Sequence, residues 1–205
     1  MKRLLSIAAI VVLSSSSVFA IPLLSPGDAI IAIDMDGNSE YPGGESPANA
    51  IDGTLAKYLN FGRENSGFIV TPSMGPTIIE SFQITTANDS PERTPIAYLL
   101  FGTNDPIVTT DNGRGLDENW TFISVGVLDL PLTPDTVGPM VYLPAPAGPF
   151  TSYKMQFLST KNFDENGFNM ANSMQIAEIQ FFGTPEPASL CLLGLGGLAL
   201  LRRRR

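Results

Sequence analysis

Short apolar stretches of strand length, separated by turn-forming residues, are the feature that most limits how this chain can fold. The first stretch, 29–33, is followed by a polar loop rich in glycine and proline at 34–45. Seven further stretches lie at 68–70, 78–85, 97–101, 120–125, 141–143, 153–158 and 174–182. Because these segments are short and turn signals recur between them, the sequence predicts an all-β sandwich.

Two of these stretches indicate which side chains face the core. In 78–84, Ile78, Phe82 and Ile84 would face inward, although Glu80 shares their parity. In 174–182 the apolar positions change parity near Glu178, which predicts a β-bulge there. The inward side chains of that stretch would be Met174, Ile176, Ile179 and Phe181.

The N-terminus has the three parts of a secretory signal peptide. A basic start at 1–3 precedes an apolar run at 4–13, and small residues at the −3 and −1 positions of 17–20 predict cleavage after Ala20. This segment is too short and wrongly flanked for a transmembrane anchor. We therefore expect a signal peptide at 1–20, a linker at 21–29 and one folded domain at 30–183.

The C-terminus also has three parts. Stiff Pro185-Glu186-Pro187 precedes 14 uncharged residues at 188–201, and the chain closes on Arg202, Arg203, Arg204 and Arg205. A helix of that length spans about 21 Å, short of the roughly 30 Å hydrocarbon core, so the arginines would snorkel at the cytoplasmic side. This predicts a short transmembrane helix; a buried C-terminal helix is the alternative, but a run apolar all round has no solvent face.

This order of parts resembles the PEP-CTERM sorting signal of Gram-negative bacteria, a tail also labelled ice-binding protein C-terminal domain. The resemblance covers the last 22 residues, 184–205. It implies recognition by an exosortase-type membrane protease, an intermediate anchored in the inner membrane, and removal of the tail. Delivery to the outer envelope or an exopolysaccharide matrix would follow.

Charge and composition exclude several functions for the exported part. Six of the 12 basic residues and one of the 20 acidic residues lie in the two targeting ends, which leaves a net charge of about −13. That charge argues against nucleic acids and anionic membrane surfaces as partners. The chain contains no histidine, which removes Ser-His-Asp and Cys-His catalysis, and its one cysteine, Cys191, lies in the tail.

Four motifs in order resemble discoidin-type domains, also called F5/8 type C, galactose-binding-like or family 32 carbohydrate-binding domains. They are Ala50-Ile51-Asp52-Gly53 and the segments 97–105 with 118–123, 153–157 and 175–183. The resemblance implies a jelly-roll β-sandwich of about eight strands. Where the family often has a tryptophan after the Asp-Gly loop, this chain has Tyr58 and Phe61.

Asp52-Gly53 has two interpretations. Asp-Gly is a favoured tight-turn pair, so the first interpretation is a turn without chemistry. The resemblance instead implies a structural Ca²⁺ held by Asp52, by backbone carbonyls and by Glu178, whose position inside an apolar strand calls for a partner. Asp34, Asp36 and Asn38, with Glu45 in the twelfth place, imitate an EF-hand loop; without glycine in the sixth place or flanking helices, we interpret it as a solvated acidic loop.

Other loop residues suit a sugar ligand. Aromatic rings stack on sugars and guanidinium groups bond hydroxyls, so the candidates are Tyr41, Phe61, Arg63 and Arg93. Ordinary loop composition is the alternative for each. Trp120 is interpreted as core rather than as a sugar platform, and 111–119 as a long loop without chemistry of its own.

The sequence as a whole predicts a non-catalytic, exosortase-sorted envelope or matrix module that binds a glycan or exopolysaccharide. A structural or adhesive matrix protein without a specific glycan ligand is the second hypothesis. A hydrolase that uses two carboxylates is the third, although no acidic pair has motif context. Apart from the structural Ca²⁺, no cofactor is expected.

Overall fold

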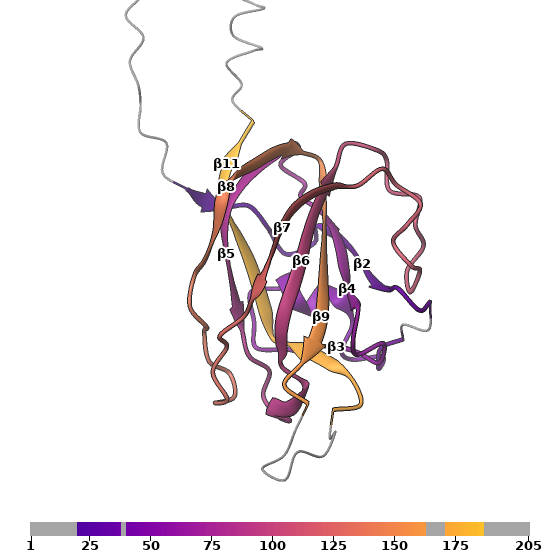
Figure 1. Ribbon diagram of the computed structural model, residues 1–205, viewed down its shortest axis with the longest axis vertical. Coiled ribbons are helices and arrows are strands. Elements are labelled where there is room, and N and C mark those ends of the chain that lie inside the picture. Colours follow the sequence, from indigo (N-terminus) through magenta and orange to yellow (C-terminus); the bar gives the residue numbers. More distant parts are fainter. Residues whose placement is uncertain (1–19, 38–39, 163–170, 187–205) are drawn as a thin grey trace, which may run out of the picture.

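The computed structural model describes residues 20–37, 40–162 and 171–186, which form a β-sandwich (Figure 1). One sheet has five strands in the order β2 (Ala29–Asp34), β4 (Ser66–Thr71), β9 (Ser152–Thr160), β6 (Pro95–Thr103) and β7 (Thr121–Val127). The other has four, in the order β1 (Ile21–Pro22), β11 (Glu178–Pro185), β5 (Thr77–Thr85) and β8 (Val141–Phe150). The predicted all-β jelly-roll class is confirmed.

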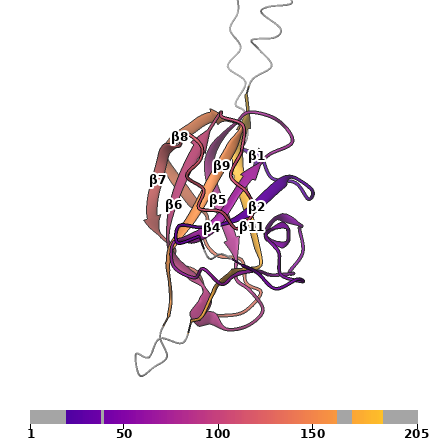
Figure 2. The ribbon, with the colours of Figure 1, turned by 90° about the vertical axis from the view of Figure 1, so that its right-hand side faces the viewer.

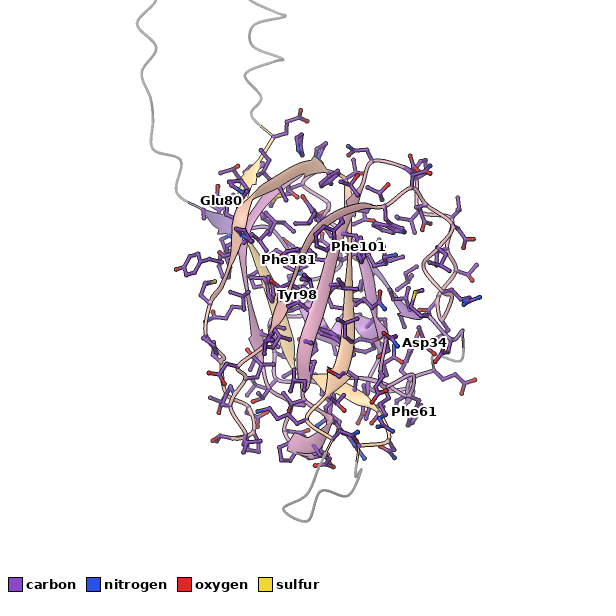
Figure 3. The ribbon with its side chains drawn as sticks, in the orientation of Figure 1. Asp34, Phe61, Glu80, Tyr98, Phe101 and Phe181 are labelled. Carbon is purple, nitrogen blue, oxygen red and sulfur yellow. The ribbon has the colours of Figure 1, made fainter. Side chains whose placement is uncertain are left out.

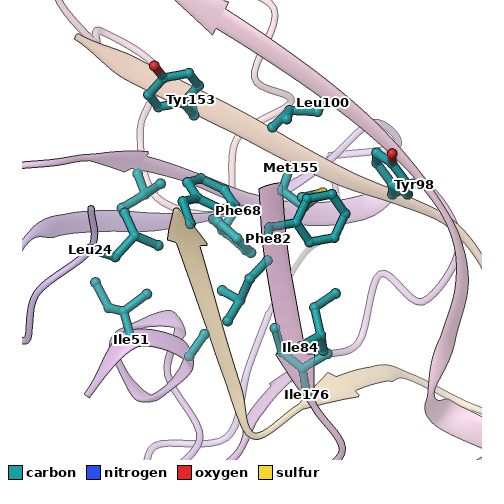
Figure 4. Packing of buried hydrophobic residues seen from close by; sticks show 14 of the residues in the cluster. Leu24, Ile51, Phe68, Phe82, Ile84, Tyr98, Leu100, Tyr153, Met155 and Ile176 are labelled. Carbon is teal, nitrogen blue, oxygen red and sulfur yellow. The ribbon is translucent and has the colours of Figure 1, made fainter. Parts of the chain in front are cut away.

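Four short elements complete the fold. β3 (Tyr58–Asn60) pairs antiparallel with β10 (Met174–Ile176), and two 3-10 turns, η1 (Pro47–Ile51) and η2 (Pro91–Arg93), lie in connections. Between the two large sheets lies one apolar core (Figure 4). Aromatic rings meet edge to face there, with Phe82 4.9 Å from Tyr98 and Tyr153 5.9 Å from Phe181 between ring centroids. Packing of this kind stabilises a domain that has no cysteine.

Both described chain ends lie at one end of the sandwich, which we call the tail end (Figure 1). Residues 21–29, expected to be a linker, belong to the fold: β1 pairs with β11, and Leu23 and Leu24 are buried in the core. The predicted sorting motif likewise starts inside the sheet. Pro185 opposes Thr77, and the Glu186 N–H donates to the Pro76 carbonyl at 2.9 Å.

The core-facing parity of β5 differs from the prediction at one residue. Ile79, rather than Ile78, is fully buried, together with Phe82 and Ile84. The reason is a bulge: Gly183 opposes Ile79 and Phe182 opposes Ser81, so Glu80 is the extra residue between them. Glu80 therefore lies on the outside of the sheet (Figure 3).

The parity change near Glu178 has another cause than the predicted bulge. The chain leaves β3 after Ile176 and joins β5 from Glu178 on, while the Ala177 N–H donates to the Thr85 carbonyl. A switch between sheets thus replaces a bulge within one. The predicted inward set is confirmed, since Met174, Ile176, Ile179 and Phe181 are all fully buried.

The long loop 104–120 lies over the outer face of the five-stranded sheet. Lys154 of β9 donates to the Gly115 carbonyl at 2.8 Å, and its Nζ lies 4.8 Å from the Phe101 ring and 4.7 Å from the Trp120 ring. Burial lowers the pKa of Lys154 to about 8, although the Glu118 charge opposes that shift. Trp120, predicted to be core, is thus half-buried over this lysine on the outer face.

No helix in 20–37, 40–162 or 171–186 is long and apolar enough to cross a membrane. The predicted signal peptide at 1–20 falls outside the described residues up to residue 19. The predicted membrane segment 188–201, Pro187 and the four closing arginines lie outside them as well.

Candidate functional site

The end of the sandwich opposite the tail end, which we call the loop end, carries the candidate ligand residues. Phe61 lies there, with Asp34 beside it (Figure 3). Phe61 follows β3 directly, and its N–H donates to the Glu40 carbonyl at 2.9 Å. Tyr41, the residue after Glu40, therefore lies on the segment beside Phe61. Phe61 is 48% exposed, so its side chain is accessible to a ligand.

Gly62 holds this loop close to the body of the domain. Its N–H donates to Asn60 Oδ1 at 2.8 Å, and a Cβ added at Gly62 would lie 2.7 Å from the Asp34 Cγ. Asp34 is 1% exposed, so the acidic loop interpreted as solvated begins with a buried carboxylate. Its Oδ1 accepts the Asp36 N–H at 3.2 Å, and the Gly37 N–H donates to its carbonyl, which makes this segment a turn under the Phe61 loop.

Tyr41 is fixed by a neighbour that the sequence did not single out. Its hydroxyl donates to Asp111 Oδ2 at 2.6 Å, and this bond raises the pKa of Tyr41, with burial and the Asp111 charge adding to it. The other Asp111 oxygen, Oδ1, accepts the Ala32 N–H at 2.8 Å. Loop 111–119 therefore positions a candidate ligand residue.

Arg63 sits in the left-handed region with φ of 58°, which the tight turn after Gly62 imposes. Its guanidinium lies 3.2 Å from Glu64, and its Nε is buried without a hydrogen-bond partner. The Arg63 carbonyl accepts the Ser66 hydroxyl at 2.8 Å, which ties the turn to the start of β4. Tyr41, Phe61 and Arg63 thus lie together along adjoining segments of the loop end.

Arg93 lies in η2, apart from this trio. No hydrogen bond or ion pair within the described chain joins it to Tyr41, Phe61 or Arg63. It faces a polar cluster that sequence reasoning missed, in which Lys57 bonds Asp89 at 2.8 Å and Gln175 donates to the Asp89 carboxylate. Burial raises the pKa of Asp89, but bonds from Lys57 and Gln175 and the nearby Arg93 charge lower it overall.

Asp52 and Glu178, the candidate calcium ligands, come together at the loop end. Asp52 directly follows η1 as its C-cap, and its Oδ1 accepts the Thr54 N–H at 2.7 Å, so the tight-turn interpretation holds. Gly53, with φ of 75°, turns its N–H to Glu178 Oε2 at 3.0 Å. Burial raises the pKa of Glu178 to about 7, and the Asp52 charge adds to the rise against the Gly53 bond.

The described residues hold no group of three or more His, Cys, Asp or Glu side chains placed to bind a metal. A cation at Asp52 and Glu178 would therefore need backbone carbonyls for its remaining ligands. Two half-buried carboxylates that repel each other suit a hard divalent cation, which prefers oxygen ligands. The residues present thus fit Ca²⁺ as two of its ligands.

Residues 184–205 match a family model described as the PEP-CTERM protein-sorting motif. This chain carries a PEP-CTERM sorting motif. The motif marks the chain as exported and sorted through exosortase in Gram-negative bacteria. No curated protein matched the chain.

Solved structures similar to the sandwich are sugar-binding and discoidin modules. A family 32 carbohydrate-binding module of Clostridium perfringens, in complex with GalNAc-β-1,3-galactose, aligns with a TM-score of 0.57 and 17% identity over 80% of this chain and 100% of that one. An F5/8 type C domain of Bacteroides fragilis aligns with a TM-score of 0.56 and 8% identity over 82% of this chain and 98% of that one. Because the sequence identities are this low, the similarity shows the fold of the domain that precedes the PEP-CTERM motif, and only the fold.

Proposed function

We propose that this chain is an exported module that binds a glycan at its loop end. Binding would follow sorting, which uses the motif at the tail end. The observation that carries the proposal is the opposition of the two ends. The sorting motif begins at Thr184 on one end, and the exposed Phe61 lies on the other (Figures 1 and 3). While the tail sits in the inner membrane, the loop end would point away from it.

The trio at the loop end has the chemistry of a sugar site. The half-exposed Phe61 ring offers a flat apolar face for the C–H face of a pyranose. The Arg63 guanidinium and the Tyr41 hydroxyl, on segments that adjoin Phe61, would supply hydrogen-bond groups. Because the exported part carries a net charge of about −13, a neutral glycan is favoured over an acidic one.

A glycan array probed with the purified protein tests this proposal. We expect retention of neutral glycans and a loss of about tenfold or more for Phe61→Ala or Arg63→Ala, because a stacking ring or a charged hydrogen bond contributes about 1–3 kcal/mol. Leu55→Ala is the control, since Leu55 is equally exposed, at 55%, and lies outside the trio. Clean negatives for the wild type across neutral and acidic glycans would remove the proposal.

A structural or adhesive role in an exopolysaccharide matrix is the second candidate. The specific observation that favours it is β7, an edge strand that contains no charged residue and no proline. The two roles are compatible, since one uses the loop end and the other the side of the sandwich.

A further inference from the structure

Three of the four edges of the two large sheets are protected against pairing with another chain. Loop 104–120 covers β2, because the Asn112 N–H donates to the Ala32 carbonyl and the Asp34 N–H donates to the Gly113 carbonyl. β1 is only two residues long, and β8 carries Pro144, Pro146 and Pro149, which cannot donate to a new strand.

The fourth edge, β7, has no such protection. Its seven residues contain no charge and no proline, and Phe122, Val125 and Val127 are 55%, 56% and 80% exposed. The β6–β7 register shifts at Ile123, so the regular part of the edge is Ser124–Val127. An exposed, apolar edge of this kind is a template for another strand.

Two residues of β7 direct their backbone N–H and C=O groups toward that open side. The Leu128 N–H donates to the Ile96 carbonyl of the preceding strand at 2.8 Å. In an antiparallel ladder the inward and outward backbone groups alternate, so the N–H and C=O groups of Val125 and Val127 point away from β6. Within the described chain no backbone group pairs with them.

We propose that β7 pairs antiparallel with β7 of a second copy of this chain about a two-fold axis. The distribution of charge favours a second copy as the partner of β7. Two copies that each carry about −13 repel through most faces, but β7 and the adjacent β8 contain no acidic or basic residue. Antiparallel pairing of one neutral strand with itself brings no like charges opposite each other within the strand.

The side of the sandwich around β7 is self-complementary under the same axis. Figure 2 shows β7 and β8 on one side, and a groove of about 300 Å³ opens between them, lined by Phe122, Phe150 and the 144–148 segment. The groove lies toward the tail end. Leu132, 64% exposed, follows β7 at the loop end. Because the paired β7 strands run in opposite directions, Leu132 of one copy would lie at the end of the other copy's β7 where the groove opens.

This arrangement restricts when pairing can occur. An antiparallel two-fold axis turns the tail ends of the two copies in opposite directions. Copies whose tails sit in one membrane therefore cannot pair, whereas copies released from it can. This step rests on the proposed sorting, while the pairing itself does not.

Sedimentation of the exported chain, purified from the cell envelope, tests the proposal. We expect a dimer for the wild type and a monomer for Val127→Pro, whose lost N–H makes no bond to β6. Val125→Lys, which places a cation on the edge without changing the backbone, should also give a monomer. Val108→Lys, at a valine that is 66% exposed outside β7, should stay dimeric.

A wild-type chain that sediments as a monomer at every concentration would overturn the proposal. So would a dimer that persists in Val125→Lys while the protein keeps its melting temperature, even if Val127→Pro fails to fold. Glycan binding is read separately on the array, so a monomer that still binds glycans removes the pairing alone, and a dimer that binds none removes the glycan site alone.

Discussion

Calcium is expected to raise the melting temperature of the purified protein, and chelation should reverse the rise. The physical reason is the pair of half-buried carboxylates, Asp52 and Glu178, whose mutual repulsion a divalent cation would relieve. At a calcium concentration about 100 times Kd, linkage gives about 2.7 kcal/mol of stabilisation. For a domain of this size that is about 5–10 °C, measured by thermal unfolding with and without chelator.

The pH dependence gives the same site a second signature. The folded-state pKa of Glu178 is raised from 4.5 to about 7. Because the folded protein then binds this proton more tightly than the unfolded chain, the calcium-free protein should lose stability as pH rises from about 4.5 to about 7. Since Glu178 is half-buried, we expect a loss on the order of 1–2 kcal/mol.

Two variants distinguish the calcium site from an ordinary turn. Glu178→Gln should remove the loss of stability between these pH values and also the response to calcium. Asp52→Ala should remove the calcium response while Glu178 still titrates, with a lower pKa. If the wild type shows no calcium shift above about pH 7, where Glu178 is ionised, Asp52 and Glu178 form a turn and nothing more.

Gly62→Ala is expected to weaken ligand binding by shifting the exposed loop that carries Phe61 and Arg63. A Cβ at this position would lie 2.7 Å from the Asp34 Cγ and 2.9 Å from Asn60 Oδ1, both on buried side chains that cannot easily move. Overpacking of this kind costs about 1–3 kcal/mol, and the exposed loop is the part free to shift. Displacement of Phe61 and Arg63 by about 1 Å should weaken glycan binding by about tenfold or more.

Gly43→Ala is the matched control for that change, because a Cβ there meets no atom within 4 Å. Binding is measured by titration with the best glycan from the array, and stability by chemical unfolding. A Gly62→Ala protein that binds as well as the wild type would show that the 60–66 loop takes no part in recognition.

Much of the fold could be predicted from the sequence, because a strand in a sandwich leaves an alternating pattern. The stretch at 174–182 showed its four buried side chains, and the Asp-Gly motif located the turn that meets Glu178. The bulge at Glu80 could not be predicted, since it depends on Gly183 opposing Ile79 in a distant strand.

Other features depend on contacts that local patterns do not record. Lys154 resembles a solvated strand residue in the sequence, yet two aromatic rings and a carbonyl surround it. Asp34 resembles part of a solvated loop, yet the Gly62 turn closes over it. Of the four predicted ligand residues, Tyr41, Phe61 and Arg63 lie on adjoining segments, whereas Arg93 lies in another group.

The most direct test of the central claim, a glycan site at the loop end, is a nuclear magnetic resonance titration. The isotope-labelled protein is titrated with an oligosaccharide that the array retains. We predict chemical-shift changes at 40–41 and 60–66, and none at the tail end around 71–77 and 150–152. Changes confined to the tail end or to the side formed by β7 and β8, or no changes for a glycan that the array retains, would contradict it.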